Sequence, residues 1–187
     1  MDALSLFVLS FALAMNGFSL AIANSSLSGK VLPGISVKAA FAFGSSHFVF
    51  GYLGYFLGGL LAPAILGIEL YTSIAFLLIL GIKVLFQATR VKPETKVFDI
   101  NQTRVIMALS VALGMNALLV GLVLGFLDVQ ALTANLLTFF LVSFFTLFGL
   151  AGGHRLGMAF ARNVAILGGV LFIAAALRMV ITLIMQA

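Results

Sequence analysis

The sequence FALAMNG at residues 11–17 decides how the chain is interpreted, because it recurs as VALGMNA at residues 111–117. Each copy places a carboxamide, Asn16 or Asn116, inside a long run of leucine, valine, alanine, phenylalanine and glycine. A polar side chain in apolar surroundings needs a hydrogen-bonding partner or a function. The repeat therefore marks both the architecture and the candidate site.

The composition indicates an integral membrane protein. Of the 187 residues, 63% are hydrophobic and only 8% are charged, which is too little polar surface to cover a water-soluble globule. The apolar runs reach the roughly 20 residues that a helix needs to cross a bilayer, and they lack the alternation typical of barrel strands. Cysteine is absent, so disulfides and thiolate metal ligands are excluded. We predict an all-α membrane protein.

We predict six membrane-spanning helices, at about residues 3–23, 37–61, 70–87, 105–127, 131–151 and 163–184. The breaks between them are expected at residues 24–26 and 33–34, at Pro63 with Gly67, and at residues 152–155. No basic segment and no cleavage site precede the first helix, so we expect it to be retained rather than removed as a signal peptide.

Basic residues sort to one side of this map. They are Lys30 and Lys38 after the first helix, Arg90, Lys92, Lys96 and Arg104 after the third, and Arg155 and Arg162 after the fifth. The other loops carry only Glu69 and Asp128. The positive-inside rule then places the basic loops in the cytoplasm and both termini outside.

The repeated sequence divides the chain into two halves. Residues 1–87 and 105–187 each hold three predicted helices, and residues 88–104 form a basic cytoplasmic loop between them. Residues 80–83 also resemble residues 175–178. Because three is an odd number, the second half enters the membrane from the opposite side. Such inverted repeats place a substrate site near the midplane, where Asn16 and Asn116 would meet.

Several polar groups are candidates for this site. For a single buried Asn, interhelical hydrogen bonding is the favoured explanation, but two at matched repeat positions shift the balance towards a shared site. His47 is an ionisable group inside the second helix that could bind a metal or relay a proton, and Ser46 precedes it. Met15 and Met115 would add soft sulfur ligands.

A second group of residues could line a cavity or act as a gate. Lys83 and Arg178 occupy matched positions of the two halves, and Ser19 follows the first Asn by one turn. For Lys83 the simplest interpretation is that it extends to the nearby headgroup region. Arg178 lies farther from the basic loops, so a polar cavity or an acidic partner is expected for it.

The sequence also excludes several classes of function. It contains no nucleophile elbow, no zinc-protease motif, no phosphate-binding glycine loop and no carboxylate pair within a predicted helix, so we do not expect an enzyme. The net charge of +5 comes from short loops rather than an amphipathic face, which argues against nucleic acid. The expected partners are the lipid bilayer and a small substrate, and a homo-oligomer is left open.

The chain resembles a known family in its six-helix plan, its length and a series of short motifs. These are the twin Met-Asn sequences, Phe43-Gly44, Ile74-Ala75-Phe76 and Ile166-Leu167-Gly168-Gly169. They are similar to the MntP-type manganese efflux pumps of the LysE exporter superfamily. The resemblance implies a bacterial inner-membrane exporter that uses alternating access and needs no resident cofactor, with Mn²⁺ as cargo.

The chain departs from that family at its acidic positions. The family has Asp where this chain has Asn16 and Asn116, a Glu where it has His47, and commonly an acid where it has Ala165. The metal ligands expected in this chain are therefore the two carboxamides and the imidazole, which should bind Mn²⁺ more weakly than carboxylates do. Three hypotheses follow: an exporter with a changed cargo, a LysE-like exporter of a neutral or zwitterionic molecule, and a membrane subunit that transports nothing.

Overall fold

The computed structural model describes residues 3–28, 31–90 and 100–186. Within these ranges all the regular secondary structure is helical, with no strand, which confirms the all-α prediction. The elements are α1 (Ala3–Ser28), α2 (Pro33–Leu61), the short 3₁₀ turn η1 (Ala62–Ile65), α3 (Glu69–Arg90), α4 (Thr103–Phe126) and α5 (Ala131–Gln186). Most of the predicted basic loop, residues 91–99, lies outside the described residues, as does Lys30.

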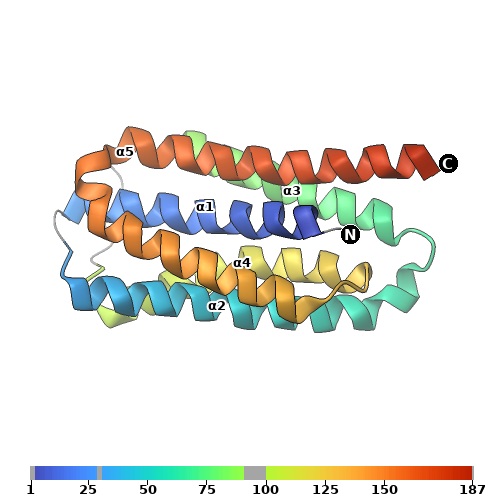
Figure 1. The fold of residues 1–187 in the computed structure, drawn as a ribbon, viewed down its shortest axis with the longest axis horizontal. Coiled ribbons are helices and arrows are strands. Elements are labelled where there is room, and N and C mark those ends of the chain that lie inside the picture. Colours follow the sequence, from blue (N-terminus) through green and yellow to red (C-terminus); the bar gives the residue numbers. More distant parts are fainter. Residues whose placement is uncertain (1–2, 29–30, 91–99, 187) are drawn as a thin grey trace.

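The long helices pack side by side along one axis, and both ends of the chain lie at the same end of the bundle (Figure 1). Within the described residues, five helices are long and apolar enough to cross a membrane. Large apolar side chains also cover much of the outer surface; examples are Phe41, Phe56, Phe140 and Leu60. A surface of this kind is matched to lipid rather than to water. The protein is a multi-pass membrane protein.

Helix α5 is bent back on itself at Gly157. The backbone there has φ 77° and ψ 169°, which is not helical, and the two arms of α5 run in opposite directions (Figure 1). Only glycine adopts such a conformation at little cost. We predicted this break at residues 152–155, which was wrong because the helix continues through them and ends its first arm at Gly157.

A hydrogen bond from α1 explains why the predicted break is helical. The Ser25 hydroxyl donates to the Leu150 carbonyl at 2.8 Å and accepts from the His154 backbone N–H at 3.1 Å. Those are the two backbone groups that an α-helix normally joins directly. The Gly153 Cα also lies against Ile22 of α1. Tertiary contacts therefore hold this glycine-rich turn in helical form.

The first predicted loop is shorter than expected. Residues 24–26 were predicted to end the first helix, but α1 continues to Ser28 because its polar side chains are satisfied within the protein: the Asn24 amide donates to the Leu20 carbonyl at 2.9 Å. Pro33 was assigned to the loop, but it occupies the first turn of α2, where its missing N–H costs nothing.

Glycines fix the distance between α2 and α4. A Cβ on Gly54 or Gly58 would overlap the backbone of Leu118 or Leu122, and one on Gly121 would overlap the Gly51 carbonyl. Small residues at these positions let two helix backbones touch, which is how helices associate in a membrane. This contact sets the height of α4, and of Asn116 within it, relative to α2.

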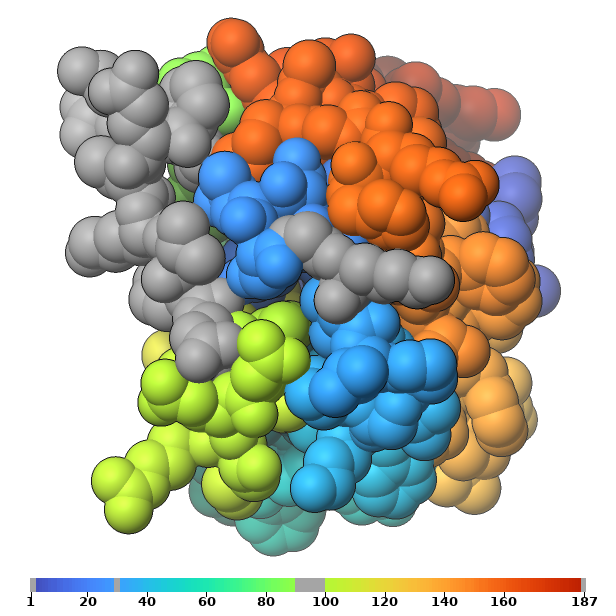
Figure 2. All heavy atoms as spheres, turned by 90° about the vertical axis from the view of Figure 1, so that its left-hand side faces the viewer, coloured from blue at the N-terminus to red at the C-terminus, as the bar shows by residue number. Residues whose placement is uncertain are grey.

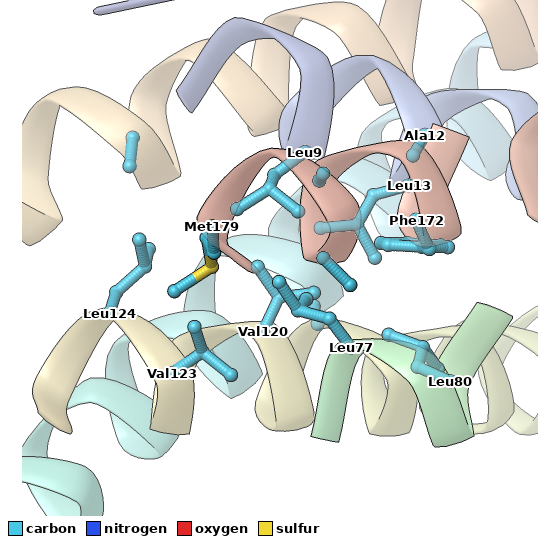
Figure 3. Close-up of a cluster of buried hydrophobic side chains, with 14 of the residues drawn as sticks. Leu9, Ala12, Leu13, Leu77, Leu80, Val120, Val123, Leu124, Phe172 and Met179 are labelled. Carbon is cyan, nitrogen blue, oxygen red and sulfur yellow. The ribbon is translucent and has the colours of Figure 1, made fainter. Parts of the chain in front are cut away.

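The largest apolar cluster fills the space between α1, α3, α4 and the second arm of α5 (Figure 3). Its buried members include Leu9 and Leu13 of α1, Leu77 and Leu80 of α3, Val120 and Val123 of α4, and Phe172 and Met179 of α5. The end of the bundle opposite the termini gathers the end of α1, the start of α2 and the bend of α5 (Figure 2). Exposed basic side chains belong to this end, including Lys38, Arg104 and Arg155.

The bend at Gly157 should be intolerant of a side chain. We expect Gly157→Ala to destabilise the protein by about 1–3 kcal/mol, because a positive φ strains an L-residue. The measurement is the melting temperature in detergent micelles. Gly152→Ala is the matched control: Gly152 is helical with open space around its Cα, so its replacement should have little effect or stabilise. Equal melting temperatures for the two variants would contradict this account.

Candidate functional site

His47 is the most completely enclosed of the predicted site residues. It has no solvent exposure, and its Nδ1 lies 2.8 Å from the Phe43 carbonyl oxygen. A carbonyl only accepts, so Nδ1 carries the proton in the neutral ring and Nε2 keeps its lone pair. Nε2 is buried and has no hydrogen-bonding partner among the described residues. This is the arrangement of a metal-binding histidine, whose other ring nitrogen donates to a backbone carbonyl.

Two hydroxyls on the first arm of α5 are also buried without a partner. Ser143 and Thr146 lie one turn apart, and neither Oγ has a hydrogen bond within the described part of the chain. A Cβ on Gly44 of α2 would overlap the Ser143 hydroxyl, and one on Gly17 of α1 would lie 3.6 Å from Thr146 Oγ1. These hydroxyls therefore lie where α5 meets α1 and α2, level with Asn16.

Ser143 and Thr146 were missed in the sequence. Each has apolar neighbours, and hydroxyl residues in apolar helices usually bond to the preceding turn of their own backbone. Their spacing of three residues, which places both on one helix face, was the available signal. The same signal occurs on α2, where Gly44 and His47 have this spacing and both are buried.

Asn16 lies beside the second arm of α5. A Cβ on Gly168 would be 3.2 Å from Met15 Cβ and 3.7 Å from the Asn16 backbone nitrogen. The Asn16 side chain is half-buried and makes no side-chain hydrogen bond within the described residues. One turn on, the Ser19 hydroxyl donates to the Ala161 carbonyl at 2.7 Å. Ser19 thus joins two helices, while the Asn16 carboxamide keeps its donors and acceptor available.

Asn116 has a specific partner. The Lys83 ammonium of α3 donates to Asn116 Oδ1 at 2.9 Å, and the Asn116 side chain is only 4% exposed. From the sequence, the simplest interpretation was that Lys83 extends to the headgroup region. In the structure its ammonium is bonded to Asn116. The lysine instead joins α3 to the repeated sequence in α4.

The height of Asn116 follows from contacts between α2 and α4. Ser46 donates to the Ser110 carbonyl at 2.6 Å, and Gly54 packs on the backbone of Leu118. Asn116 therefore lies level with the part of α2 just before Gly54. Asn16 lies near the level of Gly44, so the two carboxamides are separated by about 10 Å along the bundle axis, at a rise of 1.5 Å per residue.

The predicted residues are thus spread along the bundle rather than gathered at one point. His47 lies between the levels of Asn16 and Asn116, which do not share a depth as a direct meeting would require. Met15 is buried at 3% exposure, whereas Met115 is 52% exposed. Arg178 is half-buried in the second arm of α5. No group of three His, Cys, Asp or Glu side chains that could hold a metal occurs in the described part of the chain.

These features define a class. The chain is a helical multi-pass membrane protein with polar side chains in the middle of its span, an arrangement that in membrane proteins marks a pathway for ions or small solutes. Catalytic motifs are missing from the sequence, and the polar groups are spread over several helices.

Comparison with known proteins identifies the family. The sequence model described as "Putative manganese efflux pump" matches residues 30–180. Similar proteins carrying that name, with the designation MntP, occur in Rippkaea orientalis (27% identity, 92% of each chain) and Elusimicrobium minutum (26% identity, 99% of this chain and 100% of the relative). Another from Methanothermobacter thermautotrophicus is 25% identical over 97% of each chain. No solved structure matches significantly. The chain belongs to this family of efflux pumps.

The buried, unpartnered Nε2 of His47 is expected to lower the stability of the folded protein. We expect His47→Leu to raise the stability by about 1–3 kcal/mol, because it removes a buried nitrogen with no hydrogen bond. The readout is the melting temperature in detergent. As a control, Ser46→Ala removes the bond to the Ser110 carbonyl and should lower it. If both variants lose stability equally, Nε2 has a partner in the folded protein.

Proposed function

We propose that this protein is an efflux transporter of the cytoplasmic membrane that carries a divalent metal ion by alternating access. Membership of the efflux-pump family over most of the chain is the single observation that carries the proposal. The polar groups in the middle of the bundle support it, because uncompensated polar atoms are costly in a membrane and persist at functional sites.

The proposed transporter crosses the membrane six times, with the two arms of α5 as the fifth and sixth crossings. An even number of crossings agrees with the position of both chain ends at one end of the bundle (Figure 1). Residues 1–87 and 105–187 are then inverted repeats joined by a cytoplasmic loop at residues 88–104. The exposed basic side chains at the opposite end from the termini favour a cytoplasmic position for that end.

The cargo would bind to neutral ligands. His47 Nε2 would be the strongest ligand. The Asn16 carboxamide oxygen of α1 would be a second, and Ser143 and Thr146 of α5, which packs against both α1 and α2, would add hydroxyl oxygens. An imidazole suits transition metals such as Zn²⁺, Co²⁺ and Fe²⁺, whereas Mn²⁺ gains most from anionic oxygen ligands. We therefore expect transport of these softer ions at lower concentrations than Mn²⁺.

The weak, neutral donor set also suits a transporter. A cargo ion has to leave the site on the far side of the membrane, so its binding energy cannot be large. Ser19 and Arg178 would contribute to the walls of the pathway, since Ser19 lies one turn from Asn16 on α1 and Arg178 lies on the second arm of α5, which packs beside Asn16. A rocking motion of one repeat against the other would open each side in turn.

The test is metal flux into proteoliposomes, with a fluorescent indicator trapped inside. We expect saturable uptake of Zn²⁺ or Co²⁺ that falls at least about tenfold in His47→Ala and Asn16→Ala, because each removes one ligand. Asn24→Ala is the matched control, since the Asn24 amide bonds only to its own helix at Leu20. Absence of flux for Mn²⁺, Fe²⁺, Zn²⁺ and Co²⁺ in the native protein would refute metal export, and flux of an amino acid instead would favour the LysE-like alternative.

A further inference from the structure

The Lys83–Asn116 contact places a positive charge at the outer face of α3 against a buried carboxamide, because Lys83 itself is exposed whereas Asn116 is buried. Lys83 lies well within α3, whose residues Gly81 and Leu85 pack against Gly169 of α5. Its ammonium reaches the buried carboxamide of Asn116 at 2.9 Å. A lysine whose stem faces lipid has to bring its charge to a polar partner, and Asn116 provides one inside the protein.

The contact uses the atom that a cation would need. Asn116 Oδ1 is the only strong metal-binding atom of this carboxamide, because the amide nitrogen is a poor ligand. With the Lys83 ammonium bonded to it, a metal ion at Asn116 would have to displace a cation that is covalently tied to the chain. A divalent ion bound to Asn116 would lie a few ångströms from this ammonium, and the two cations would repel each other.

We infer that Lys83 is a specificity-determining residue: its ammonium is a tethered cation that occupies the Asn116 end of the pathway and excludes divalent ions from it. The inference rests on the proposed function for its meaning in transport. Cargo then binds at His47 and Asn16, of which Asn16 lies about 10 Å from Asn116 along the axis. Lys83 has to swing off Asn116, or cargo has to bypass it, for an ion to pass that level.

Lys83 changes the result expected when an acidic ligand is restored at Asn116. If Asn116 were an open ligand, Asn116→Asp alone would tighten Mn²⁺ binding. With Lys83 in place, the new carboxylate forms an ion pair with the ammonium, so its charge is already neutralised. Only removal of the lysine as well would free the carboxylate for the metal.

The experiment is a double-mutant cycle of Asn116→Asp and Lys83→Gln, read by equilibrium Mn²⁺ binding in detergent. Bound Mn²⁺ is measured from the loss of the electron paramagnetic resonance signal of the free ion. We expect Asn116→Asp to bind within about threefold of the native protein and the double variant to bind at least about tenfold tighter than either single variant. Lys38→Gln, which removes an exposed lysine of α2, replaces Lys83→Gln in the control cycle and should show no coupling.

Two outcomes would overturn the inference. One is equal Mn²⁺ affinity of Asn116→Asp and the double variant, which would mean that the ammonium does not compete with the ion. The other is weaker binding in Lys83→Gln than in the native protein. A second cycle uses Lys83→Met, which leaves no hydrogen-bond donor at this position. Only variants that elute as folded protein on size-exclusion chromatography are compared. Because binding is measured without transport, a failed flux assay leaves this test intact.

Discussion

The structure depends on one constraint: inside a bilayer, each polar group has to find its partner within the protein. Most do. Ser25 satisfies two backbone groups of α5, Ser46 reaches α4 and Lys83 reaches Asn116. These bonds tie helices that are distant in sequence. Against that background, four buried side-chain atoms have no partner among the described residues: Nε2 of His47 and the hydroxyls of Ser73, Ser143 and Thr146. Of these, His47 and Ser143 lie on the packed helices α2 and α5. A group without a partner inside the protein is available for a cargo.

Close packing of backbones brings these groups together. Glycines on α2 and α4 let the two helices touch, and Gly17 and Gly44 leave room for the hydroxyls of α5. The bend at Gly157 then returns the chain, so that the second arm of α5 covers Asn16. Small residues therefore do two things here: they join helices without a hydrophobic driving force, and at Gly17 and Gly44 they leave space for polar side chains of α5.

The helical membrane fold could be predicted because long apolar runs specify it. The family could be predicted because the repeated sequence and other short motifs resemble it. Element ends were less predictable. Residues 24–26 and 152–155 are polar or glycine-rich, yet they stay helical through contacts with other helices that no local pattern encodes. At the candidate site, the sequence indicates which helices carry polar groups such as His47 and Asn116, but not their contacts. The bond from Lys83 to Asn116 joins residues 33 positions apart and depends on how α3 packs. Ser143 and Thr146 carry no sequence signal beyond their spacing.

The central claim is that the His47 imidazole offers its free Nε2 to a transported metal. Crystals of the native protein equilibrated with Zn²⁺, with diffraction collected on both sides of the zinc absorption edge, test it most directly. The account predicts an anomalous peak about 2.0–2.1 Å from His47 Nε2, the usual zinc–imidazole distance, on the side of Asn16 rather than of Asn116. Zinc bound elsewhere, with His47 Nε2 hydrogen-bonded to a protein group, would contradict it.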